Sequence, residues 1–311
     1  MGVCFTAILC RGQSTDLLVA AFSADAVLRY DGSSGALVGT FASHPSLDGA
    51  ASITYGPDGN LYVLGEFSRN VLRFDGFTGA FIDTFISGVA MTAVGLTDPG
   101  FMEFGPDGNL YILHHITGET EAVWRFDASS GAFVDKFATG SGMAHTHGIA
   151  FGVGNFYLGN VGDNRIERYD PVTGAFLGTL GPDPDGGLAG LGSLAFGPDA
   201  LLYATTVSIG GVRQINPDTG AVTTFIAGDG TVSSSTWGIL FDGDKVYVGY
   251  IGIDAIRTFD ASTGAFLGDF VAAGGVSSPY DMAFMPVPEP ATVILLLAAL
   301  PLIWLRKRAG D

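Results

Sequence analysis

The segment YDGSSGAL at residues 30–37 decides the fold, because close copies of it recur along the chain. The copies are FDGFTGAF at 74–81, FDASSGAF at 126–133, YDPVTGAF at 169–176, INPDTGAV at 215–222 and FDASTGAF at 259–266. Their glycines are 44, 52, 43, 46 and 44 residues apart. In each copy an Asp or Asn precedes this glycine by four residues. Its side chain can accept nearby backbone N–H groups while the glycine takes a positive φ, so each copy predicts a tight hairpin between two short strands.

A second hairpin repeats between these copies. It reads SITYGPDGNLYVLG at 52–65, FMEFGPDGNLYILH at 101–114, IAFGVGNFYLGN at 149–160, LAFGPDALLYATT at 194–206 and ILFDGDKVYVGY at 239–250. Each period therefore holds four short strands, here called A to D in chain order. Four strands in about 44 residues are typical of one blade of a β-propeller.

The two ends of the repeat region complete each other. The first repeat, LLVAAF at 17–22 and AVLRYD at 26–31, lacks strand A, whereas SPYDMAF at 278–284 is a strand A with nothing after it. We predict that residues 279–284 pair with residues 17–22 and close the ring, which removes an open sheet edge. The fold class is all-β, a six-bladed propeller of four-stranded blades over residues 17–285.

Composition agrees with this fold and excludes some functions. The 311 residues include 47 Gly, 23 Phe and 10 Tyr, and this content argues against both disorder and a helical protein. Rings that recur at one position of each blade are expected to pack between neighbouring sheets. Acids outnumber bases 31 to 14, for a formal charge of -17, so no basic surface for nucleic acid is expected.

The C-terminal segment, residues 286–311, reads PVPEPATVILLLAALPLIWLRKRAGD. Its apolar run, residues 291–305, is shorter than the roughly 20 residues of a comfortable helical span, so a buried core helix is the alternative. The run is apolar all round, however, and it ends at the basic cluster Arg306, Lys307 and Arg308. We therefore predict an apolar helix that enters the membrane, with the basic cluster as a stop-transfer signal on the cytoplasmic side.

The order of Pro288-Glu289-Pro290, the apolar run and the basic cluster resembles the PEP-CTERM sorting tail of Gram-negative bacteria. This resemblance implies an exosortase-type sorting protease as partner, recognition through Pro288, Glu289 and Pro290, and export to the cell surface or extracellular matrix. The family normally also carries an N-terminal signal peptide. Residues 1–16 hold only a short apolar stretch, and we interpret them as the remnant of a signal peptide or a disordered lead.

The blade pattern resembles the NHL and streptogramin-lyase-like six-bladed propellers over about 270 residues. The resemblance to streptogramin lyases implies catalytic His and Glu residues near the central cavity. A resemblance to gluconolactonase-like propellers would imply a divalent cation bound at the mouth formed by strands A. Here His147 is the one residue of a matching type at this mouth. The rim has no ring of acids or Asn, which argues against a metal-dependent lactonase and leaves the divalent metal as an open alternative.

Candidate site residues gather on the face with the longer loops, where binding sites usually lie. His114 and His115 end one strand B, while His145 and His147 enter the next strand A. These histidines form either a metal site or general base, or simply polar loops without a ligand. Aligned entrances of strands A place Tyr280, Ala51, Gly100, His147, Gly192 and Trp237 around the central mouth. The large rings either hold a small or sugar-like ligand or plug the channel.

Two acids, Glu103 and Asp281, occupy strand A positions that other blades fill mostly with small or apolar residues. A buried carboxylate needs a partner or a shifted pKa. Our leading hypothesis is an exported binding or matrix module without catalytic machinery, whose ligand is a carbohydrate, a small molecule or a protein on the loop face. The alternative is a lyase- or lactonase-type enzyme that uses His147, His145 and Glu103.

Overall fold

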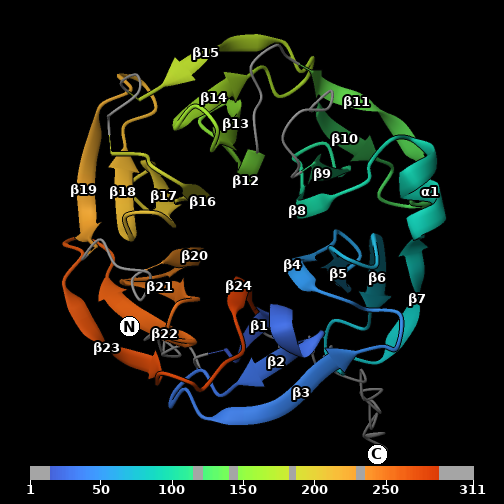
Figure 1. Ribbon diagram of the computed structural model, residues 1–311, viewed down its shortest axis with the longest axis horizontal. Coiled ribbons are helices and arrows are strands. Elements are labelled where there is room, and N and C mark those ends of the chain that lie inside the picture. Colours follow the sequence, from blue (N-terminus) through green and yellow to red (C-terminus); the bar gives the residue numbers. More distant parts are fainter. Residues whose placement is uncertain (1–14, 115–121, 140–145, 182–186, 229–234, 287–311) are drawn as a thin grey trace, which may run out of the picture.

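The computed structural model describes residues 15–114, 122–139, 146–181, 187–228 and 235–286. These residues form six antiparallel sheets of four strands, arranged like the blades of a propeller around a central axis (Figure 1). The predicted all-β, six-bladed fold is confirmed. The sorting tail, with its apolar run and basic cluster, lies outside the described residues, as do residues 1–14.

Strands A to D of each blade follow one another from the axis outward. Blade 1 consists of β24 (Pro279–Phe284), β1 (Leu17–Ala21), β2 (Ala26–Tyr30) and β3 (Leu37–Ser43), and blade 2 of β4 (Ala50–Tyr55), β5 (Leu61–Gly65), β6 (Asn70–Phe74) and β7 (Phe81–Ile86). Blade 3 consists of β8 (Pro99–Phe104), β9 (Leu110–His114), β10 (Ala122–Phe126) and β11 (Phe133–Thr139), and blade 4 of β12 (Thr146–Gly152), β13 (Asn155–Asn160), β14 (Arg165–Tyr169) and β15 (Phe176–Leu180). Blade 5 consists of β16 (Leu191–Phe196), β17 (Leu202–Thr206), β18 (Gly211–Ile215) and β19 (Val222–Ala227), and blade 6 of β20 (Thr236–Asp242), β21 (Lys245–Tyr250), β22 (Ala255–Asp260) and β23 (Phe266–Val271).

The ring closes by pairing of the C-terminal strand β24 with the N-terminal strand β1. Leu17 lies opposite Phe284 and Ala20 opposite Asp281, with an irregularity in register at Ala21. The predicted pairing is confirmed, although β1 ends one residue earlier than predicted, because Phe22 begins a short 3₁₀ turn (Phe22–Ala24).

Aromatic rings fill the space between neighbouring blades. Tyr62 of blade 2 contacts Phe85 of its own blade and Phe104 of blade 3, with edge-to-face geometry at 4.9 and 5.0 Å between ring centroids. The equivalent Tyr111, Tyr203 and Tyr247 likewise contact one ring of their own blade and one of the next, edge-to-face in every pair except the tilted Tyr203–Phe241. Edge-to-face pairs of this kind add to the burial of apolar area. The recurring rings are therefore packing residues, as the repeat predicted.

The turns between strands C and D are held by an acid and a glycine. In the first copy, Asp31 Oδ1 accepts the backbone N–H groups of Ser33 and Ser34 at 3.1 and 2.8 Å, and Gly35 has φ of 69°. A Cβ atom on Gly35 would lie 1.8 Å from the carbonyl oxygen of Phe270 in the neighbouring blade. The glycine is thus required by its backbone conformation and also by the close approach of the next blade.

One long connection contains structure that the sequence did not predict. Residues Gly88–Ala93, between blades 2 and 3, form the helix α1, and the Oγ atom of Ser87 accepts the N–H of Ala90 at its first turn. The side chain of Met91 is buried and joins the apolar cluster between these blades. The six-residue helix is too short to appear as a periodic pattern in the sequence.

Two turn glycines provide a matched test of blade packing. Gly79 and Gly220 both have φ of 72°, but an added Cβ would lie 1.9 Å from the Phe41 carbonyl oxygen at Gly79 and has no neighbour closer than 3.6 Å at Gly220. We expect Gly220→Ala to cost about 1–2 kcal/mol of unfolding free energy, from backbone strain alone. Gly79→Ala should cost about 1–3 kcal/mol more, from overpacking. Urea denaturation of both variants measures the difference, and equal losses would contradict the role assigned to the contact.

Candidate functional site

The central mouth on the loop face is lined by the six residues that the sequence alignment of strands A predicted. Ala51, Gly100, His147, Gly192, Trp237 and Tyr280 all line one space between the strands. Its volume is only about 10 Å³, room for one water molecule at most. The rings of Trp237 and Tyr280 are stacked with centroids 4.7 Å apart, and the His147 ring meets Trp237 edge-on at 4.7 Å. Aromatic side chains thus plug the mouth.

The plug continues outward over the loop face. Phe22 stacks on Tyr280 with centroids 4.3 Å apart, and Phe67 meets Phe22 edge-on at 5.3 Å. Phe67 is 60% exposed and marks the outer end of this row of rings. The sequence did not single out Phe22 or Phe67, because the equivalent connections between strands B and C of blades 4, 5 and 6 contain no aromatic residue.

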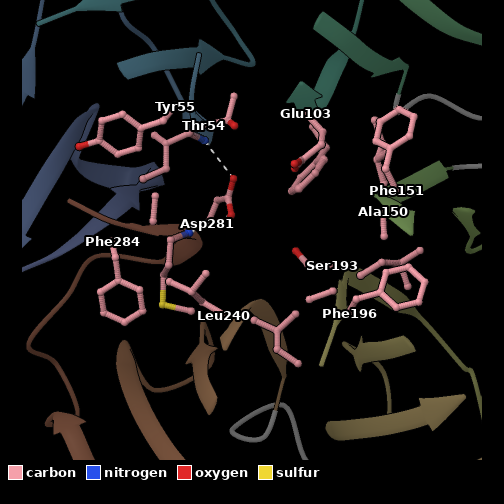
Figure 2. A pocket seen from close by; sticks show the side chains of 18 residues that line it. Thr54, Tyr55, Glu103, Ala150, Phe151, Ser193, Phe196, Leu240, Asp281 and Phe284 are labelled. Carbon is pink, nitrogen blue, oxygen red and sulfur yellow. Dashed lines mark hydrogen bonds between the residues drawn. The ribbon is translucent and has the colours of Figure 1, made fainter. Parts of the chain in front are cut away.

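A larger cavity lies on the other side of the plug, toward the face that bears the short turns. Its volume is about 430 Å³, and all six strands A contribute to its walls. Phe101 and Ser193 border both this cavity and the plugged mouth, whereas Tyr55, Phe151, Phe196 and Phe284 lie at the far ends of their strands. We call this space the channel cavity. Figure 2 shows Glu103 and Asp281 directed into it from different blades.

Asp281 is fixed near the plugged end of the channel cavity. Its Oδ2 atom accepts the Ser52 hydroxyl at 2.8 Å and the Ile53 N–H at 3.0 Å, and its Oδ1 atom accepts the Met282 N–H at 2.8 Å. Burial raises the pKa of this carboxyl to about 6, although the three donors oppose the rise. Since Ser52 and Ile53 belong to blade 2, Asp281 also ties the closing strand β24 to the next blade.

Glu103 projects into the same cavity from β8, nearer the turn face. Its side chain is half-buried and lines the cavity wall. Burial, together with the negative charge of Asp281, raises the pKa of Glu103 to about 8. At neutral pH the cavity therefore holds one ionised carboxylate, Asp281, and a Glu103 that is largely protonated.

The predicted histidines do not converge on these acids. His114 is buried in blade 3, where its Nε2 atom lies 3.2 Å from the Thr97 hydroxyl and its ring is 5.4 Å from that of Trp124. His147 is part of the plug, whereas Glu103 lies in the channel cavity and does not line the mouth. His115 and His145 lie outside the described residues. Within the described ranges, no group of three or more His, Cys, Asp or Glu side chains is placed to hold a metal ion.

The part of the chain that the structure describes contains no helix long and apolar enough to span a bilayer. The predicted membrane-entering run, residues 291–305, lies outside the residues covered by this finding.

Comparisons with known proteins show the fold. No protein-family model matches the chain, and no curated protein matches it. Similar solved structures include a nidogen/laminin complex (TM-score 0.66, 12% identity, 88% of this chain and 98% of that chain). Virginiamycin B lyase from Staphylococcus aureus is also similar (TM-score 0.57, 14% identity, 75% and 73%), as is a putative 6-phosphogluconolactonase from Bacteroides uniformis (TM-score 0.58, 18% identity, 83% and 82%). The chain therefore has the six-bladed propeller fold, with distant structural neighbours of streptogramin B lyase type.

The raised pKa of Glu103 predicts how stability depends on pH. The folded state binds this proton more tightly than the unfolded chain, so the contribution of Glu103 to stability is fully present below the ordinary pKa of 4.5 and is lost as pH rises toward 8. Glu103→Gln removes this loss. We expect the variant to melt close to the wild type at pH 4.5 and at least about 2 °C higher at pH 9, since 1 kcal/mol shifts the midpoint by about 2–4 °C in domains of roughly this size.

Calorimetric melts across this pH range measure the effect. The comparison at pH 4.5 is the internal control, because a side chain that merely packs would shift the midpoint equally at every pH. If the difference in melting midpoint between wild type and variant is the same at pH 4.5 and pH 9, Glu103 is not held in its neutral form.

Proposed function

We propose that this protein is an exported, surface-sorted binding module whose propeller has no catalytic machinery. The observation that carries the proposal is the plug at the loop-side mouth. Stacked rings of Trp237 and Tyr280 occupy the place where a substrate would enter, and they leave His147 in a space of about 10 Å³ while Glu103 lies in the channel cavity. A general acid and a general base need to reach the same reacting group, and these two residues line different spaces.

Binding would use surfaces that the rigid ring presents. The loop face carries the exposed ring of Phe67 beside the plug, and loops on a rigid scaffold commonly carry binding function. A propeller of this fold occurs in the nidogen/laminin complex, which supports a protein as ligand. A carbohydrate or a small molecule is the other ligand class in this proposal. The formal charge of -17 argues against nucleic acid as partner.

Export and sorting would depend on the C-terminal segment. In this proposal, an exosortase-type protease recognises Pro288-Glu289-Pro290 while residues 291–305 sit transiently in the inner membrane and Arg306, Lys307 and Arg308 stay on the cytoplasmic side. The mature propeller would then reach the cell surface or extracellular matrix of a Gram-negative bacterium. Residues 1–16 would hold what remains of a signal peptide.

Sorting is tested by changing Pro288, Glu289 and Pro290 together to Ala. We expect the wild-type chain to be processed and released from the membrane fraction, and the variant to be retained there at full length, because the protease no longer recognises it. Cell fractionation with an antibody against the propeller measures both. The control changes Pro286 to Ala, outside the motif, and should leave processing intact. Recovery of wild type and variant alike in the cytosol would refute the sorting proposal.

The second candidate function is that of a lyase- or lactonase-type enzyme with a site at His147. It is favoured by the position of His147 at the mouth and by structural neighbours that include virginiamycin B lyase. If this function is correct and depends on a metal, the purified protein should contain about one divalent ion per chain, because a catalytic metal is held at one specific site. Elemental analysis should then show its loss in His147→Ala. If the leading proposal is correct, neither the wild type nor His147→Ala contains stoichiometric metal.

A further inference from the structure

The channel cavity has the size and form of a small-molecule site on the face opposite the plug. Its volume of about 430 Å³ falls within the usual range for ligand pockets. It is closed at one end by the residues that border the plug, and the last residues of the strands A surround its other end. A ligand would therefore enter from the face of the short turns, without displacing Trp237 or Tyr280.

The charge of the cavity is negative and is not balanced within it. Glu103 and Asp281 supply its two acids, and no Lys, Arg or His is among the described residues that line it. No described residue donates a hydrogen bond to the Glu103 carboxyl, which Figure 2 shows directed into the cavity. An enclosed carboxyl without a donor is costly to ionise, and a cation between the two acids would remove this cost.

Asp281 is already oriented for such a cation. Its donors Ser52, Ile53 and Met282 are on the protein side and fix the carboxylate plane, and a carboxylate has about four acceptor positions. Binding would therefore require little rearrangement of this group. Ser193 borders the same end of the cavity and adds a hydroxyl.

The rest of the wall selects against a bare metal ion. Ca²⁺ takes six to eight oxygen ligands and Mg²⁺ requires octahedral oxygen geometry, whereas most residues around this cavity are aliphatic or aromatic. Rings of Tyr55, Phe151, Phe196 and Phe284 line its turn-side end. Such rings pack against an apolar ligand body, and their faces attract a nearby organic cation.

We propose that the channel cavity binds a small organic ammonium ion, with the nitrogen between Glu103 and Asp281 and the apolar body against the aromatic rings at the turn-side end. The ammonium group donates its hydrogen bonds to Glu103 and Asp281, and water completes its shell. This inference rests on the proposed binding function, for which it names a ligand class and a site apart from the loop face.

The test uses benzylammonium chloride as probe and isothermal titration calorimetry at pH 8.5 with the full propeller. We expect saturable binding at one site of the wild type. Glu103→Gln should weaken it at least about tenfold, the loss expected for one hydrogen bond to a charged group. Benzyl alcohol, which has nearly the same shape without the charge, should bind at least about tenfold more weakly than benzylammonium, for the same reason.

Glu66→Gln provides the matched control. Glu66 is also an acid whose pKa is raised by burial, to about 7, but it does not line the channel cavity and its charge acts on Tyr280 at the plugged mouth. This variant should bind benzylammonium as the wild type does. Asp281→Asn should weaken binding as Glu103→Gln does, and its melting temperature shows whether the ring is still closed.

Three outcomes would overturn the inference. They are the absence of saturable binding to the folded wild type, equal binding of benzylammonium and benzyl alcohol, and tight binding of CaCl₂ that depends on Glu103. Sorting is measured independently, by cell fractionation, so a negative result here leaves the exported-module proposal standing. Conversely, if the protein is found in the cytosol but still binds benzylammonium, the sorting proposal is refuted and the inference about the channel cavity stands.

Discussion

Pairing of β24 with β1 is the contact on which the rest of the structure depends. It completes blade 1 from two segments that lie at opposite ends of the repeat region, and the register places Asp281 opposite Ala20. The same strand brings Tyr280 to the mouth and Asp281 into the channel cavity. Both features of the candidate site therefore exist only when the ring is closed, because β24 has no other sheet to join.

Closure also explains why the acid in β24 is tolerated. A buried carboxylate is normally destabilising, but Asp281 accepts three hydrogen bonds, two of them from residues in blade 2. The acid thus connects the closing strand to the blade beside it. Glu103 receives no such compensation from the described residues, and its pKa is raised further above the ordinary value than that of Asp281. The two acids therefore differ in their protein partners: Asp281 ties the closing strand to blade 2, whereas Glu103 accepts no hydrogen bond from the described residues.

Aromatic side chains perform two different tasks in this molecule. Tyr62 and its equivalents recur in phase with the blades and fill the space between sheets, as at Tyr111 and Phe151. Tyr280 and Trp237 instead occupy the entrances of strands β24 and β20, where the other blades carry His or small residues. Their rings stack on each other, and Phe22 from the connection after β1 stacks on Tyr280, so that the three rings close the channel. A plug of this kind divides the axis into a closed mouth and a cavity of about 430 Å³. Any ligand site must therefore lie on one side of the plug or the other.

The sequence alone determined the all-β class, six blades, closure by residues 279–284 and the six residues around the mouth. These features could be predicted because each follows from the local repeat. The turn acid and glycine mark the hairpins, the alternating apolar residues mark the strands, and the strand missing from the first repeat indicates how the ring closes. It also singled out Glu103 and Asp281 as departures from the repeat. Helix α1 escaped prediction because it lies in a connection without a repeat. The rings of Phe22 and Phe67 escaped it because their connections recur in length but not in aromatic content.

Only the tertiary structure decided that His147 lies in a plug, that His114 is buried in its blade and that the two acids line a cavity apart from both. These facts depend on how side chains from different blades meet across the axis. Such contacts are set by ring closure and packing, which join residues far apart in the chain, such as Ser52 and Asp281 at a separation of 229 positions. No local pattern carries that information.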